Sequence, residues 1–188
     1  MRVIFPPRNY LLRNYFVNSR FNTDKALFFL GGPILGGSGW QLEAAEFLDQ
    51  HTSAAVIACP TRIASLFVHE VPPIEPAFTE QLDWEAYFMM VAAVEGCLIF
   101  WLPRESLAAP RDDGRPYAMM TRDEIGVWRE RLSKAPHLNV VFGIEDGFPG
   151  KPELVFLHRR HLGDISRIGH SLRETLDMAL EKAPWCQK

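Results

Sequence analysis

The sequence alternates short, continuously apolar runs with longer segments whose apolar residues have helical spacing. Strands that are apolar throughout are typical of a parallel sheet that is buried on both faces. Four such runs are KALFFLGG, AAVIACP, GCLIFWLP and LNVVFGIE, and we interpret PELVFLHRR as a fifth. The alternation predicts an α/β fold: a single Rossmann-like domain with a mostly parallel, five-stranded sheet flanked by helices, of the flavodoxin-like type.

Residues 1–25 differ from the rest because they mix arginine, asparagine and aromatic residues without periodicity. We expect them to form an N-terminal extension, with a short strand packing on the edge of the domain. Residues 26–188 form the α/β domain itself. The sequence has no internal repeat and no low-complexity segment.

Charge and cysteine content restrict the function classes. The formal net charge of -3 argues against a general nucleic-acid-binding protein, which is usually basic. Three cysteines without CxxC spacing indicate a reducing, cytoplasmic setting rather than a disulfide framework. They are Cys59, Cys97 and Cys186.

Neither a targeting segment nor a membrane span is expected. The first apolar run is interrupted by Pro6 and Pro7, too early for the core of a signal peptide. The most hydrophobic region, 88–102, contains Glu95 and is too short to cross a bilayer. The sequence therefore predicts a soluble protein.

A glycine-rich stretch, GGPILGGSGW, follows the first strand of the domain. It lacks both the Gly-Lys-Ser/Thr ending of a P-loop and the GxGxxG spacing of a dinucleotide site. It either lines a ligand pocket, because open α/β sheets bind ligands at the carboxyl ends of strands, or forms only a tight turn with positive φ. Trp40, which follows it, either stacks on a flat ligand ring or packs in the core.

The segment TRDEIGVW contains a carboxylate with two interpretations. Thr121 and Glu124 have the spacing of a capping box, in which both side chains satisfy backbone N–H groups at a helix start. Alternatively, Glu124 is a nucleophile near a helix N-terminus, where the helix dipole favours the ionised form. Gly126 would then allow close packing of this turn beside the site.

Two further segments contain polar candidates. In QLDWEAYF, Asp83 and Glu85 are two residues apart and point in different directions on a helix, so we expect only one of them to face a site. Arg62, after ACPT, contacts either an anionic or carbonyl group of a ligand or only the surface. The His158 and His161 pair is not expected to bind a metal, because no cysteine or carboxylate cluster supports it.

Together these segments resemble the nucleoside 2-deoxyribosyltransferase family, in particular its divergent bacterial and phage branch. The resemblance covers roughly residues 27–147. The matching segments, in order, are FFLGGPI, ACPTR, QLDWE, GCLIFWLP, TRDEIGVW and VVFGIE.

The resemblance implies roles for individual residues. Glu124 occupies the position of the family's nucleophile in a T-x-x-E-[LI]-G type motif, which also includes Thr121. An acid near QLDWE, either Asp83 or Glu85, resembles a carboxylate that helps to handle the base. The residues implied to bind substrate are Gly31, Gly32, Pro33, Trp40, Arg62, Tyr117 and Thr121.

The sequence also departs from the family pattern. The loop from Arg104 to Met120 is longer than usual, and Ala118 stands where the family has an aspartate. Phe28 and Phe29 provide no hydroxyl near the first strand, so Tyr117 or Tyr87 would replace the tyrosine that orients the nucleophile.

The implied activity is transfer of a 2-deoxyribosyl group between nucleobases in nucleotide salvage, through a covalent glycosyl-glutamate intermediate and without a metal or organic cofactor. The alternatives are a nucleoside or nucleotide N-glycoside hydrolase on the same scaffold, and a non-catalytic sensor of nucleotide derivatives. The expected partners are a 2-deoxynucleoside, a free base and further copies of the chain, in a homodimer or higher homo-oligomer.

Overall fold

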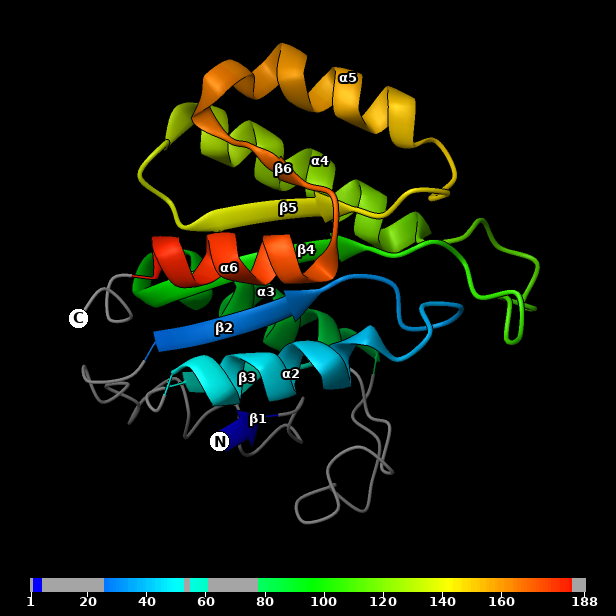
Figure 1. The fold of residues 1–188 in the computed structure, drawn as a ribbon, viewed down its shortest axis with the longest axis horizontal. Helices are drawn as coiled ribbons and strands as arrows, with labels where there is room; N and C mark the ends of the chain where they lie inside the picture. The colour runs from blue at the N-terminus through cyan, green and yellow to red at the C-terminus, as the bar shows by residue number, and fades with distance from the viewer. Residues whose placement is uncertain (1, 5–25, 53–54, 61–77, 184–188) are drawn as a thin grey trace.

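A six-stranded parallel sheet in the order β1-β3-β2-β4-β5-β6 forms the centre of the molecule (Figure 1). The structure is a computed structural model that describes residues 2–4, 26–52, 55–60 and 78–183. The strands are β1 (Arg2–Ile4), β2 (Ala26–Gly31), β3 (Ala55–Ala58), β4 (Gly96–Leu102), β5 (Val140–Ile144) and β6 (Ile168–Gly169). The predicted α/β fold of a Rossmann-like domain is confirmed, and without β1 the strand order is the flavodoxin-like one.

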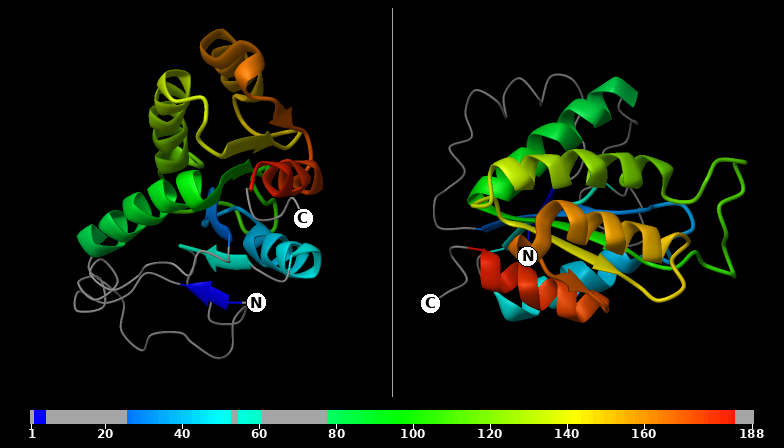
Figure 2. Two further views of the ribbon diagram at one scale, coloured as in Figure 1. Left: turned by 90° about the vertical axis from the view of Figure 1, so that its left-hand side faces the viewer. Right: turned by 90° about the horizontal axis from the view of Figure 1, so that it is seen from above.

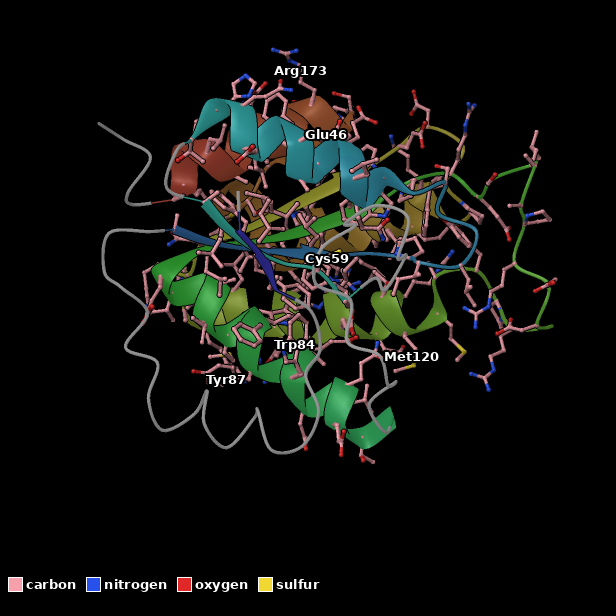
Figure 3. The ribbon with its side chains drawn as sticks, turned by 90° about the horizontal axis from the view of Figure 1, so that it is seen from below. Glu46, Cys59, Trp84, Tyr87, Met120 and Arg173 are labelled. Atoms are coloured by element: carbon pink, nitrogen blue, oxygen red, sulfur yellow. The ribbon has the colours of Figure 1, made fainter. Side chains whose placement is uncertain are left out.

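Helices cover both faces of this sheet (Figure 2). One face carries α2 and α6, which contact each other, and the opposite face carries α3 and α4, with α5 packed on α4. In Figure 3, Glu46 on α2 and Arg173 on α6 lie on one side, whereas Trp84 and Tyr87 on α3 lie on the other. The helices are α2 (Trp40–His51), α3 (Phe78–Glu95), α4 (Met119–Lys134), α5 (Lys151–Leu162) and α6 (Leu172–Lys182), with a 3₁₀ turn η1 (Gly163–Ile165). Within the described ranges, no helix has the length and apolarity that a membrane span requires.

The continuous apolar runs are buried because each strand supplies both cores. Phe28 packs on the α2 and α6 side, and its neighbour Phe29 packs on the α3 and α4 side. Between β4 and β5, Phe100 and Phe142 stand in register, with stacked rings whose centroids are 5.6 Å apart. Successive side chains of a strand point to opposite faces, so both faces of the central strands require apolar residues.

The segment 152–160 is helical, so its prediction as a strand is wrong. Leu154, His158 and Leu162 are the buried residues of α5, and their spacing of four is that of one helix face. Pro152 lies in the first turn, where the missing N–H is not needed. The two residues of β6 take the place beside β5 instead, and β1 makes the sixth strand.

The N-terminal extension was expected to contribute an edge strand, and β1 occupies that edge, beside β3. Residues 5–25 lie outside the described part of the chain.

Glycine at position 143 lets α6 approach the sheet closely. A Cβ atom there would lie 2.0 Å from Thr175 Oγ1 of α6 and 2.6 Å from Trp101 Cε3. The same threonine would meet a Cβ at Gly169, at 2.4 Å. The contact between α6 and strands β5 and β6 therefore depends on these glycines.

We predict that Gly143→Ala lowers the free energy of unfolding by about 1 to 3 kcal/mol, because the added methyl group overpacks the core. Gly126→Ala is the matched control: a Cβ at Gly126, inside α4, meets nothing within 4 Å. The control should instead gain about 0.5 to 1 kcal/mol, from the higher helix propensity of alanine. Denaturant unfolding of both variants measures the difference, and equal stability of the two would contradict this packing.

Candidate active site

A cavity of about 300 Å³ opens at the carboxyl end of β2, between Pro60 after β3 and the loop that follows β4. Here the strand order reverses, since β3 lies on one side of β2 and β4 on the other. Open α/β sheets bind ligands at such a point, and the volume lies at the small end of the usual range for ligand pockets. The walls come from the end of β2 and its glycine loop, Pro60 after β3, the first turns of α3 and the segment leading into α4.

The glycine loop forms one wall of this cavity. Gly31, Gly32 and Pro33 all line the cavity. A Cβ at Gly32 would lie 2.4 Å from Trp101 O and 2.6 Å from Trp40 Cζ2, so only glycine fits this close approach.

Trp40 supports this loop from beneath. Its side chain is buried, and its Nε1 donates to Pro33 O at 3.2 Å, beside Gln41 Nε2 at 3.3 Å. Trp40 is not among the residues that line the cavity. Of its two predicted roles, the structure therefore places Trp40 in the core.

Tyr117 holds the β4–α4 loop rather than facing the cavity. Its hydroxyl donates to Pro103 O at 3.0 Å, and its ring lies against Gly36 of the glycine loop and against Phe148. Burial raises the pKa of the phenol well above its usual value, and the carboxylates of Glu105 and Glu145 add to the rise. In this arrangement the hydroxyl positions the loop and does not orient Glu124.

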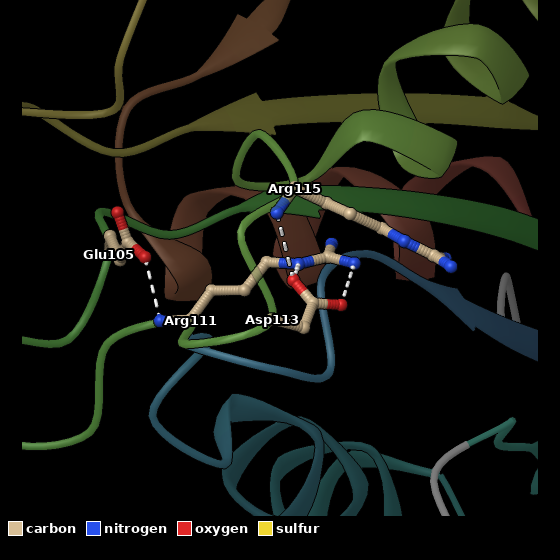
Figure 4. Close-up of polar contacts among 4 residues, drawn as sticks. All are labelled: Glu105, Arg111, Asp113 and Arg115. Carbon is tan, nitrogen blue, oxygen red and sulfur yellow. Dashed lines mark hydrogen bonds and ion pairs between the residues drawn. The ribbon is translucent and has the colours of Figure 1, made fainter.

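Arg111, on the same loop, also lines the cavity, and no sequence pattern predicted this. Figure 4 shows its polar contacts with Asp113 and Glu105. Its guanidinium binds Asp113 in a bidentate manner, with Nη2 2.7 Å from Oδ2, and its backbone N–H donates to Glu105 Oε1 at 2.8 Å. The hydrogen bonds from Arg111 lower the pKa of Asp113 to about 2. Asp113 therefore neutralises the charge of Arg111 at neutral pH.

Helix α4 begins at Met119, two residues before the predicted start, so the capping box is wrong. Ala118 is the N-cap, with φ 56°, and no side chain caps the helix. Thr121 is then the third residue of the helix and Glu124 the sixth, and both line the cavity. The sequence rule failed because the chain before Met119 already turns, with Met119 N donating to Pro116 O. Glu124 consequently has no capping role.

The pKa of Glu124 is raised to about 7. Burial is the main cause, and the neighbouring carboxylates of Glu85 and Asp123 raise it further. The helix N-terminus was expected to favour the ionised form, but Glu124 lies in the second turn, where the dipole effect is weak. The carboxyl group is thus close to half ionised at neutral pH, as is suitable for a group that exchanges protons or attacks a substrate.

Glu85 faces Glu124 from α3. It lines the cavity, and its Oε1 accepts a hydrogen bond from Gln81 Nε2 at 2.7 Å. Asp83 is exposed and does not line the cavity. The rotation of α3 decides between the two, because Trp84 and Phe88 are buried on its inner face.

Other candidates lie elsewhere. Arg62 falls outside the described residues, and Gly126 borders open space, so close packing does not require it. His158 and His161 lie on α5, away from the cavity. Over the described part of the chain, no group of three or more His, Cys, Asp or Glu side chains is arranged to hold a metal ion.

The cavity combines two carboxylates with apolar walls. Phe29, Leu35, Leu82 and Met119 are among its apolar lining residues. The described charged groups are Glu85, Glu124 and the neutralised Arg111. Such a site suits a small, uncharged ligand with polar groups, and its carboxylates can stabilise positive charge that develops on it.

No protein-family model matches this chain, and no curated protein is significantly similar to it.

We predict that Glu124→Gln is more stable than wild type at about pH 8. The variant's gain in the free energy of unfolding over wild type should be roughly 2 kcal/mol larger at about pH 8 than at about pH 5. The wild-type carboxyl has a pKa of about 7 in the folded protein, above its ordinary value of 4.5. The stability that its neutral form contributes is therefore present below pH 4.5 and is lost as the pH rises through 7. Glutamine stays neutral throughout.

Denaturant unfolding at both pH values tests this, with Glu46→Gln on the exposed side of α2 as the control. If the difference in the free energy of unfolding between Glu124→Gln and wild type does not change with pH, the pKa of the Glu124 carboxyl is not raised.

Proposed function

We propose that this protein transfers a 2-deoxyribosyl group between nucleobases, with Glu124 as the nucleophile, in cytoplasmic nucleotide salvage. The main support is the pairing of Glu124 with Glu85 in a cavity at the point where the strand order reverses. The resemblance of TRDEIGVW to the transferase motif gives Glu124 its role. The absence of a capping role for Glu124 among the described contacts favours this assignment.

In the first step, a carboxylate oxygen of Glu124 forms a bond to the anomeric carbon as the bond from that carbon to the base nitrogen breaks. The base leaves with the electron pair and takes up a proton, because a nitrogen anion is a poor leaving group. In the second step, a nitrogen of another base attacks the anomeric carbon, the ester bond to Glu124 breaks, and the incoming base loses a proton. Configuration is retained over the two inversions.

Glu85 is the residue that we assign to the base. It lies in the same cavity as Glu124, and its hydrogen bond with Gln81 holds one carboxylate oxygen in place. A carboxyl group beside the departing base can hydrogen bond to it and pass on a proton. Two carboxylates in one cavity also stabilise the positive charge that builds up on the sugar in the transition state.

The described charges favour a nucleoside over a nucleotide as the substrate. Arg111 is already paired with Asp113, so Glu85 and Glu124 leave the described lining with a net negative charge. A 5′-phosphate dianion would be repelled by them.

We predict that the wild-type protein forms a new 2-deoxynucleoside from a 2-deoxynucleoside and a different free base, and that Glu124→Gln lowers this rate at least about a thousandfold. The rate on the acidic side should rise with pH through about 7, because the nucleophile must be ionised. Chromatography of the reaction mixture follows the products, and Glu46→Gln is the control for folding. Free base without exchange would identify a hydrolase, and an absence of turnover would favour the sensor.

Glu85→Gln and Asp83→Asn form a matched pair on α3. We expect Glu85→Gln to lower the exchange rate by about 10²- to 10⁴-fold, the usual contribution of acid–base catalysis. Asp83→Asn should leave the rate unchanged, because Asp83 is exposed and outside the cavity lining. Equal effects of the two substitutions would contradict the assignment of Glu85.

We further propose that the chain forms a homodimer or higher homo-oligomer through α3. Leu82, Met90 and Val94 are exposed large apolar residues on this helix, and exposed apolar patches often mark protein interfaces. Size-exclusion chromatography with light scattering should give at least a dimer, and Val94→Glu should shift it towards the monomer. A monomeric wild-type protein would refute the proposal.

A further inference from the structure

A second cavity, of about 460 Å³, lies at the opposite edge of the sheet from β1. It opens between the C-terminal half of α5, the turn after it and the last strand, β6, which runs beneath α5 (Figure 1). None of its lining residues lines the cavity that contains Glu124. The two cavities are therefore separate sites.

The floor of the second cavity contains a buried, uncharged histidine. His158, buried on α5, is hydrogen bonded through Nε2 to Ser166 O at 3.2 Å, and its ring packs edge-on against Phe142. Burial lowers the pKa of His158 to about 4, so the imidazole is neutral at pH 7. In that form Nε2–H donates to the carbonyl and ties α5 to the segment that enters β6.

The walls, in contrast, are cationic. Arg159 on α5 and Arg167 before β6 both line the cavity, and both are exposed. Among the side chains that the structure describes, no carboxylate forms an ion pair with either of them. With His158 and the two arginines, His170 makes a fourth nitrogen-bearing side chain in the lining.

Two acidic groups on neighbouring segments have partners of their own. Glu174 accepts the backbone N–H of His170 at 2.8 Å, and Asp146 binds Lys151 Nζ at 2.8 Å. Behind the floor, Arg129 on α4 is close enough to contribute to the lowered pKa of His158. The lining of the cavity contains two arginines and no carboxylate, on a protein whose net charge is -3.

We propose that this pocket binds a small molecule with a phosphate or diphosphate group, held by Arg159 and Arg167. Two guanidinium groups on separate elements can each donate bidentate, charge-assisted hydrogen bonds to phosphate oxygens. The volume exceeds what a single phosphate needs and falls within the range of pockets for nucleotide-sized ligands. The acidic cavity near Glu124 has the opposite character, so such an anion would select the second site.

Titration calorimetry with inorganic pyrophosphate and adenosine diphosphate tests the proposal, with adenosine as the phosphate-free comparison. Both phosphates should bind with a dissociation constant below about 1 mM. Adenosine, which is uncharged, fits only the cavity near Glu124, so substitutions in the second cavity should not change its binding. The double variant Arg159→Gln/Arg167→Gln should weaken binding at least about tenfold, because it removes charge-assisted hydrogen bonds.

Arg160→Gln is the matched control: Arg160 is an exposed arginine on the same helix, outside the cavity lining. It changes the net charge of α5 without touching the pocket, and binding should stay at the wild-type level. The proposal is overturned if neither phosphate binds, if the double variant weakens the binding of adenosine as much as that of adenosine diphosphate, or if Arg160→Gln weakens phosphate binding as much as the double variant. Thermal melting of all variants confirms that they are folded.

Discussion

The reversal of strand order between β2 and β4 is the constraint from which the candidate active site follows. The chain leaves β2 on one side to reach β3 and later returns on its other side as β4. The connections after these two strands therefore diverge to opposite faces, and a crevice remains between them. The glycine loop, Glu85 and Glu124 reach this crevice from three different segments. Close approach at Gly32, where a Cβ would collide with the carbonyl of Trp101, keeps the crevice open.

The crevice also explains the perturbed carboxyl of Glu124. Helix α4 points its second turn into a partly apolar space, so ionisation of Glu124 loses hydration that the protein does not fully replace. A structural role would not require this cost, since glutamine would fill the same space without it. A carboxyl group that lowers the stability of the fold and lies beside a second carboxyl is typical of functional sites. The buried apolar core on both faces of the sheet stabilises the fold and offsets the cost of this carboxyl group.

Four of the strands could be predicted because central parallel strands need apolar residues on both faces. The fifth prediction failed at 152–160, where a buried histidine and a four-residue spacing describe a helix face. The glycine loop and Glu124 could be proposed as candidates from the sequence, and both line the cavity. The choice between Asp83 and Glu85 needed the rotation of α3. Arg111 could not be found because its direction depends on a loop folded around Asp113 and Glu105, and no local pattern encodes that geometry.

The central claim is that Glu124 holds the sugar covalently, and mass spectrometry of the protein during turnover tests it most directly. The wild-type protein, quenched in acid after incubation with a 2-deoxynucleoside, should gain the mass of one deoxyribosyl group on the peptide that contains Glu124. The Glu124→Gln variant should show no such gain. The account would be contradicted if the wild-type protein turned over with the adduct on another carboxylate. It would also be contradicted if Glu124→Gln formed as much adduct as the wild type.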